Sequence, residues 1–126
     1  DGIDGARALI HADLHFGNVV FSANRAAPID FDDAGFGYLM YDVATSLIPY
    51  VESPRWPELR DSLLTGYADV RPLPEQQLAV LPEFLAARNL TMAVWLTLRQ
   101  PLIHRLPRDL GPFLARTAGL CRQIAD

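Results

Sequence analysis

Residues 9–33, LIHADLHFGNVVFSANRAAPIDFDD, contain nearly all the side chains of this sequence that could take part in phosphoryl or metal chemistry. These side chains fall into two polar clusters, separated by an apolar run and a turn. The first cluster consists of His11, Asp13, His15 and Asn18, and the second of Asp30, Asp32 and Asp33. Carboxylates and histidines transfer protons or bind metals, and an amide oxygen can help to coordinate a hard cation. This grouping predicts a functional site rather than an ordinary polar surface.

The residues around the two clusters predict how the clusters are positioned. Residues 9–10 and 19–21 are apolar enough for buried strands, whereas residues 11–17 are too polar for a core strand and are expected to form a loop. Residues 22–27 are expected to form a turn before a second short strand, with Asn24 suited to a left-handed or Asx-turn position. The pattern therefore predicts a hairpin that follows a polar loop.

A hairpin of this kind would bring Asp30 back beside Asn18. One carboxylate and one amide oxygen would then face a common point, which suits a hard cation such as Mg²⁺ that holds nucleotide phosphates. Asp13, on the same loop as Asn18, would stand across from them and could accept the proton of a hydroxyl group.

Three motifs occur in order within residues 11–44. HADLHFGN at 11–18 has the pattern H-x-D-x-x-x-x-N, IDFDD at 29–33 contains I-D-F, and YDVA at 41–44 has D-hydrophobic-A. In these motifs the chain resembles the aminoglycoside phosphotransferase and choline kinase family of small-molecule kinases. The resemblance implies an α+β, mainly helical fold: the C-terminal lobe of a protein-kinase-like fold, with a short catalytic β-hairpin near the N-terminus.

The resemblance also implies an activity and a role for individual residues. The activity is transfer of the γ-phosphoryl group of ATP to a hydroxyl of a small molecule, such as an aminoglycoside, choline or homoserine. By the resemblance, Asp13 is the catalytic base or orients the hydroxyl, and Asn18 and Asp30 are ligands of Mg²⁺. His11 corresponds to a histidine that braces the loop, and Asp42 to a structural acid that secures it.

Asp32 and Asp33 have no single fixed role in the family pattern. We expect His15 to support the site, and Asp32 and Asp33 to contact the metal, its ligands or the substrate. With His11 and Asp13, His15 also forms His-x-Asp-x-His, a cluster that can bind zinc or a two-metal centre in hydrolases. A metal-dependent hydrolase is therefore an alternative, although its three ligands on alternate residues would need an extended strand. A non-catalytic binding module derived from a kinase lobe is another alternative.

Composition limits the size and the partners of the protein. With 126 residues, 50% of them hydrophobic, residues 1–126 are expected to form a single domain. The net charge of −4 gives no electrostatic support for a nucleic-acid partner. All 11 basic residues are arginines, so the chain lacks the lysine with which protein kinases pair nucleotide phosphates, and it also lacks their glycine-rich loop. We therefore expect the C-terminal lobe of a longer kinase, nearly inactive without its nucleotide-binding N-terminal lobe.

No membrane span is predicted, because no apolar run reaches about 18 residues. No signal peptide is predicted either, because DGIDGARALI at 1–10 lacks a basic n-region and an h-region. The single Cys121 fits a reducing compartment, and we expect a cytoplasmic protein with no membrane partner. Cys121 falls in a helical pattern, where a free cysteine is expected to be buried.

Apolar periodicity predicts helices over most of the remaining chain. They are expected at residues 38–50, 58–70, 75–81, 84–98 and 110–124. The helix at 84–98 is apolar on nearly all sides, which predicts a buried central helix with Met92 and Trp95 in the core. Its Arg88 is expected to extend to the surface or to pair with a core carboxylate. A connection that carries His104 is expected at residues 99–108.

Overall fold

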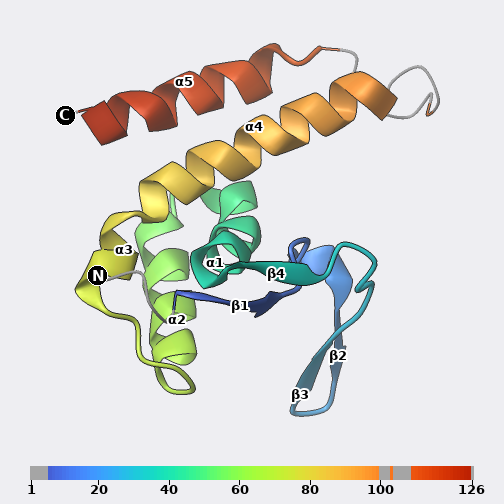
Figure 1. The fold of residues 1–126 in the computed structure, drawn as a ribbon, viewed down its shortest axis with the longest axis vertical. Helices are drawn as coiled ribbons and strands as arrows, with labels where there is room; N and C mark the ends of the chain where they lie inside the picture. The colour runs from blue at the N-terminus through green and yellow to red at the C-terminus, as the bar shows by residue number, and fades with distance from the viewer. Residues whose placement is uncertain (1–5, 100–102, 104–108, 126) are drawn as a thin grey trace. The chain divides into compact units, whose positions relative to one another are not determined.

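The structure, a computed structural model, describes residues 6–99, 103 and 109–125. These residues form mostly helices, together with two small antiparallel sheets (Figure 1). The mainly helical α+β character predicted from the sequence is confirmed. The chain divides into two compact units, residues 1–81 and 82–126. The predicted connection at 99–108 falls largely outside the described residues, and His104 lies outside them.

The first sheet of the first unit pairs two strands that are distant in sequence. β1 (Arg7–Ile10) and β4 (Gly35–Tyr38) run antiparallel. A Cβ atom at Gly37 would lie 2.5 Å from Cδ1 of the buried Ile10, so only glycine fits at this position of β4 without a shift. The close pairing fixes the position at which the chain leaves β1.

The second sheet is the predicted hairpin, formed by β2 (Val19–Ser22) and β3 (Arg25–Pro28). The expectation that residues 19–21 form a buried strand is wrong, because Val20 and Phe21 are exposed. A two-stranded sheet needs a further layer to bury a face. The ring of Phe16 stacks on Phe21, with 5.1 Å between centroids, but Phe21 remains 58% exposed.

The turn of the hairpin differs in detail from the prediction. The left-handed backbone conformation falls on Ala23, with φ of 50°, and not on Asn24. The register explains this result: Ser22 lies opposite Arg25, so the turn has only two residues and its first one carries the positive φ.

Four helical segments complete the first unit. They are α1 (Leu39–Leu47), the 3₁₀ turn η2 (Ile48–Tyr50), α2 (Trp56–Ala68) and α3 (Glu75–Ala79). The buried side chains of Met40, Val43 and Leu47 follow one face of α1 at the predicted helical spacing. Pro57 lies in the first turn of α2, where its missing N–H costs no helical hydrogen bond.

The second unit contains α4 (Leu81–Arg99), whose first residue belongs to the first unit, and α5 (Gly111–Ala125). Asn89, only 1% exposed, ties the two helices together by donating to the carbonyl oxygen of Phe113 at 2.6 Å and to Oγ1 of Thr117 at 2.7 Å. These bonds satisfy a buried amide that would otherwise be costly.

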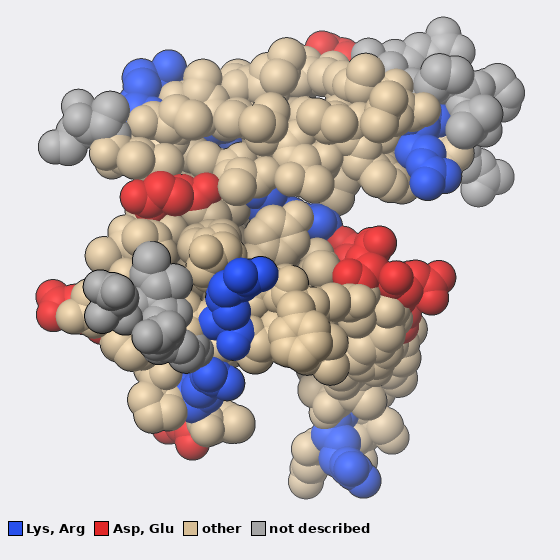
Figure 2. Space-filling model, viewed as in Figure 1, with Lys and Arg blue, Asp and Glu red and all other residues tan. Residues whose placement is uncertain are grey.

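The expectation that α4 is buried on nearly all sides is wrong. Its buried positions, which include Leu85, Ala93 and Leu96, follow one face, whereas Trp95 is 42% exposed. The exposed apolar set on α4 consists of Leu90, Val94, Trp95 and Leu98. In Figure 2 the visible surface of α4 and α5 carries few charged side chains. Among the described residues, only one face of α4 is packed against other side chains. The sequence of α4 alone does not show which of its apolar faces will be covered.

Two smaller expectations concern Arg88 and Cys121 in the second unit. Arg88 is 7% exposed, which contradicts the first of its two expected placements, extension to the surface. The expectation that Cys121 is buried is wrong, because it is exposed. The longest helix found in the described part of the chain is not apolar enough to cross a membrane, and the shorter ones are not long enough.

Candidate active site

The polar loop (residues 11–18) connects the two small sheets of the first unit. It leaves β1, passes through the 3₁₀ turn η1 (Phe16–Asn18) and enters β2. The backbone N–H of Ile29 donates to the carbonyl oxygen of Asn18 at 2.9 Å, which extends the hairpin by one step beyond β3. Ile29 therefore pairs with Asn18, and Asp30 is the next residue along the chain. This is the proximity of Asp30 to Asn18 that the sequence predicted.

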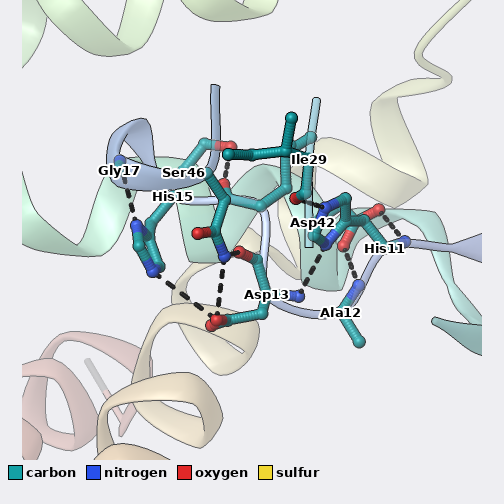
Figure 3. Close-up of polar contacts among 10 residues, drawn as sticks. His11, Ala12, Asp13, His15, Gly17, Ile29, Asp42 and Ser46 are labelled. Carbon is teal, nitrogen blue, oxygen red and sulfur yellow. Dashed lines mark hydrogen bonds and ion pairs between the residues drawn. The ribbon is translucent and has the colours of Figure 1, made fainter. Parts of the chain in front are cut away.

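Asp42 of α1 holds the start of the polar loop. Its Oδ2 accepts from the backbone N–H of His11 at 2.8 Å, and its Oδ1 accepts from the N–H of Ala12 at 2.7 Å (Figure 3). Ala12 has φ of 66°, a left-handed conformation that costs a residue with a side chain about 1–2 kcal/mol. Hydrogen bonds to a carboxylate are strong enough to offset such strain. The structure thus places Asp42 against the loop that it was expected to secure.

A second anchor from α1 was not anticipated from the sequence. The hydroxyl of Ser46 donates to the carbonyl oxygen of Leu14 at 2.6 Å (Figure 3). Ser46 lies four residues after Asp42, so the two side chains share one face of the helix. That spacing was visible in the sequence, but serines are common on helix surfaces and the spacing alone does not reveal the contact.

The carboxylate of Asp13 lies between two nitrogen-bearing side chains. Nδ2 of Asn18 donates to both the carbonyl oxygen of Asp13, at 3.0 Å, and its Oδ2, at 3.1 Å. Nε2 of His15 lies 3.5 Å from the same Oδ2. Both bonds from the buried Asn18 use its amide nitrogen, so the amide oxygen keeps its lone pairs for a cation. The structure thus brings together three of the predicted site residues.

His11 bridges the polar loop to the segment that carries the second cluster. Its ring is buried, with Nε2 2.8 Å from the carbonyl oxygen of Ile29 and Nδ1 3.4 Å from the N–H of Asp13. Since a carbonyl can only accept, this network assigns the proton to Nε2 and leaves Nδ1 as the acceptor. The ring also packs against Phe31, with 4.6 Å between centroids. His11 therefore lies where a bracing residue is expected.

The two histidines of the loop do not converge on one point. Nδ1 of His15 accepts from the N–H of Gly17 at 3.0 Å, while both nitrogens of His11 face backbone groups. Nowhere in the described residues do three or more His, Cys, Asp or Glu side chains gather closely enough to hold a metal ion. This geometry disfavours the hydrolase alternative, which requires such a cluster.

The second cluster is open to solvent. Asp30, Asp32 and Asp33 are all exposed, and Asp30 has a left-handed backbone with φ of 64°. Within the described part of the chain, the carboxylates of Asp32 and Asp33 form no hydrogen bond or ion pair. Figure 2 shows acidic surface beside the base of the hairpin. The amide oxygen of Asn18 and the exposed carboxylate of Asp30 are both oxygen donors, the kind of ligand that a hard divalent cation prefers.

The charge of Asp42 also reaches α2. The pKa of Tyr67 is raised above its usual value, mainly because burial disfavours the phenolate. Arg71 opposes this shift by attraction, and the negative charge of Asp42 adds to it. Asp42 is the smallest of these three causes of the shift in the pKa of Tyr67.

Comparison with known proteins agrees with this geometry. The model of the phosphotransferase enzyme family matches residues 2–79, which include the whole polar loop, the second cluster and α1. The chain belongs to this family.

Curated relatives of the chain include two small-molecule kinases. Amicoumacin kinase of Bacillus subtilis is 29% identical over 91 residues, which cover 65% of this chain and 27% of the relative. Homoserine kinase of Paramagnetospirillum magneticum is 38% identical over 109 residues, which cover 79% of this chain and 33% of the relative. The chain thus spans only about a quarter to a third of these relatives.

Solved structures of two kinases are similar in fold. The microcompartment-associated aminopropanol kinase has a TM-score of 0.73 at 31% identity, over 96% of this chain and 37% of that one. Amicoumacin kinase hAmiN, solved with AMP-PNP, Ca²⁺ and Ami, has a TM-score of 0.67 at 26% identity, over 94% of this chain and 37% of that one. The fold is therefore kinase-like.

Proposed function

We propose that the protein transfers the γ-phosphoryl group of ATP to a hydroxyl of a small molecule such as an aminoglycoside, choline or homoserine. The observation that carries the proposal is the Asp13 carboxylate, held by Asn18 on a loop that adjoins the exposed Asp30. Kinases of this type need a group that accepts the proton of the substrate hydroxyl, and this group must lie close to the metal ligands. Residues 1–126 form, in this proposal, a single domain that is the C-terminal lobe of a longer kinase, with an N-terminal lobe completing the nucleotide site.

Asp13 accepts or orients the proton of the attacking hydroxyl. Asn18 and His15 both face its Oδ2, so the carboxylate is oriented before substrate arrives. Because phosphoryl transfer requires little covalent chemistry from the protein, such orientation is a large part of catalysis. Asp42 contributes by accepting from the N–H groups of His11 and Ala12, and His11 contributes by accepting from the N–H of Asp13.

Asn18 and Asp30 are the residues that would hold Mg²⁺, with Asp32 as a further support from the exposed cluster. When bound, Mg²⁺ neutralises the charge of the nucleotide phosphates. The chain's own contribution is to fix the amide of Asn18 through Asp13 and to present Asp30 at the end of the hairpin. The bound AMP-PNP and Ca²⁺ of the hAmiN structure support nucleotide and divalent-cation use in a relative.

The partners in this proposal are a nucleotide and a small hydroxyl substrate, in the cytoplasm, with no nucleic acid or membrane partner. The net charge of −4 offers little attraction to polyanions. The names of the relatives, which include aminopropanol and homoserine kinases, support an acceptor that carries both a hydroxyl and an amine.

A label-transfer assay tests the proposal. The natural polypeptide that contains this sequence is incubated with Mg²⁺, γ-labelled ATP and a panel of small alcohols that includes aminoglycosides, choline, homoserine and aminopropanol. We expect transfer of label to at least one alcohol, retained in Asp61→Asn, an exposed acid of α2, and lost in Asp13→Asn. Release of labelled phosphate alone would indicate a hydrolase, and nucleotide binding without transfer would indicate a binding module; either result refutes the proposal.

A further inference from the structure

Ser46 contacts the polar loop on the opposite side of Asp13 from Asp42. Asp42 holds the N–H groups of residues 11 and 12, and the hydroxyl of Ser46 holds the carbonyl oxygen of Leu14 at 2.6 Å (Figure 3). The one face of α1 therefore anchors the chain both before and after Asp13. None of the three motifs includes Ser46.

The contact fixes the orientation of one peptide group. The carbonyl oxygen of Leu14 accepts from Ser46, and the N–H of His15, in the same peptide plane, donates to the carbonyl oxygen of Asp13 at 2.9 Å. Because the peptide group is planar, fixing its oxygen also fixes the direction of its N–H. Loss of the Ser46 bond would let this plane rotate and weaken the bond to Asp13.

The hydroxyl of Ser46 differs in direction from those of three helical threonines in the described part of the chain. Thr91, Thr97 and Thr117 each donate to the carbonyl oxygen four residues earlier in their own helix, at 2.8 to 2.9 Å. Such local bonds are the common choice of a hydroxyl inside a helix. Ser46 instead donates to a residue 32 positions away in the polar loop.

We propose that Ser46 is a positioning residue for phosphoryl transfer, which holds the backbone of Asp13 so that its carboxylate faces the reacting hydroxyl. This role rests on the proposed function. A misplacement of about 1 Å at a reacting group can cost about 100-fold in rate. The hydroxyl of Ser46 therefore affects turnover more than nucleotide affinity.

Kinetics of Ser46 variants in the natural polypeptide test the role. Ser46→Ala is expected to lower kcat by about 10- to 100-fold and to change the KM for ATP by less than about twofold. Ser46→Thr keeps a hydroxyl on Cβ and is expected to restore most of kcat. Ser62→Ala, the same change at an exposed position of α2, is expected to match wild type. An unchanged kcat in Ser46→Ala, or no recovery in a folded Ser46→Thr, would overturn the role.

Amide hydrogen exchange separates this inference from the proposed function. In Ser46→Ala we expect exchange of the His15 amide at least about tenfold faster than in wild type and in Ser62→Ala. A wild-type protein that transfers no phosphoryl group refutes the proposed function and the positioning role of Ser46 together. An active wild type with Ser46→Ala unchanged in both kcat and exchange refutes only the role of Ser46.

Discussion

The two acidic segments of the first unit are built in opposite ways. Asp13 lies on a loop whose backbone is bonded to α1 and to the hairpin, and its carboxylate faces two side chains. Residues 30–33 carry three carboxylates that are all exposed, and Asp32 and Asp33 form no hydrogen bond or ion pair with any residue that the structure describes. The polar loop is therefore a fixed segment, in which Asp13 is held in place. Residues 30–33 are an open segment, in which the carboxylates are accessible.

The difference suits the two tasks that we propose for these segments. A group that accepts a proton from a bound hydroxyl must be oriented in advance, because orientation is what lowers the barrier. A group that binds a metal–nucleotide complex must admit a large charged ligand and release it after each turnover. The fixed and the open carboxylates therefore match a reacting group and a ligand-exchanging group.

The most severe test of the fixed segment is Asp13→Ala. We expect kcat in the natural polypeptide to fall by about 10²–10⁴-fold, because a positioned proton acceptor contributes on that scale. Nucleotide affinity, measured by calorimetry, should change little, since Asp13 is not a proposed metal ligand. A variant that keeps more than about a hundredth of the wild-type rate would show that Asp13 does not have this role. Asp61→Ala, an exposed acid on α2, serves as the control.

The anchoring of the loop is tested by Asp42→Ala. Two backbone N–H groups, of His11 and Ala12, would lose a charged acceptor at 2.8 and 2.7 Å. We expect the free energy of unfolding, measured in urea, to fall by about 3 kcal/mol, whereas a surface change such as Asp61→Ala stays within about 0.5 kcal/mol. Equal stability of the two variants would mean that Asp42 does not secure the loop.

The open segment is tested by Asp30→Ala. Removal of a carboxylate ligand should weaken Mg²⁺–nucleotide binding at least about tenfold, or about 1.4 kcal/mol, as measured by calorimetry. Because the Asp30 side chain is exposed, stability should fall by no more than about 1–2 kcal/mol, the cost of an alanine in the left-handed conformation of residue 30. The opposite pattern, unchanged nucleotide affinity with a large loss of stability, would make Asp30 a structural residue and remove the contrast with Asp13.

Sequence patterns predicted the site better than they predicted its surroundings. The loop, the hairpin and the place of Asp30 after the residue paired with Asn18 followed from polarity, turn residues and short-range spacing. Ser46 was missed because it contacts a residue 32 positions away in the sequence. At that separation, the spacing of residues along the chain does not indicate which of them are in contact. The left-handed φ of Ala12 was also missed, since alanine gives no signal for that conformation.

Burial was the property that the sequence predicted least well. Hydrophobicity predicted a buried α4 and a buried β2, yet Trp95, Leu98 and Phe21 are exposed. Periodicity identifies a helix or strand from its own residues, but burial depends on which other segments cover each face. The predicted helices were therefore found near their expected positions, while the central placement of α4 was not.

The smallest expected effect concerns the strain in the fixed segment. Ala12 has φ of 66° and is held there by Asp42. Ala12→Gly removes a cost of about 1–2 kcal/mol in the folded state and adds about 0.5–1 kcal/mol of chain entropy to the unfolded state. We therefore expect a gain of up to about 1 kcal/mol in urea unfolding, with kcat within about twofold of wild type. A matched Ala115→Gly change in the middle of α5 should instead lose about 0.5–1 kcal/mol. If both glycine variants lose stability equally, the left-handed conformation of Ala12 stores no strain. The hydrogen bonds of the loop would then not have to offset any backbone strain.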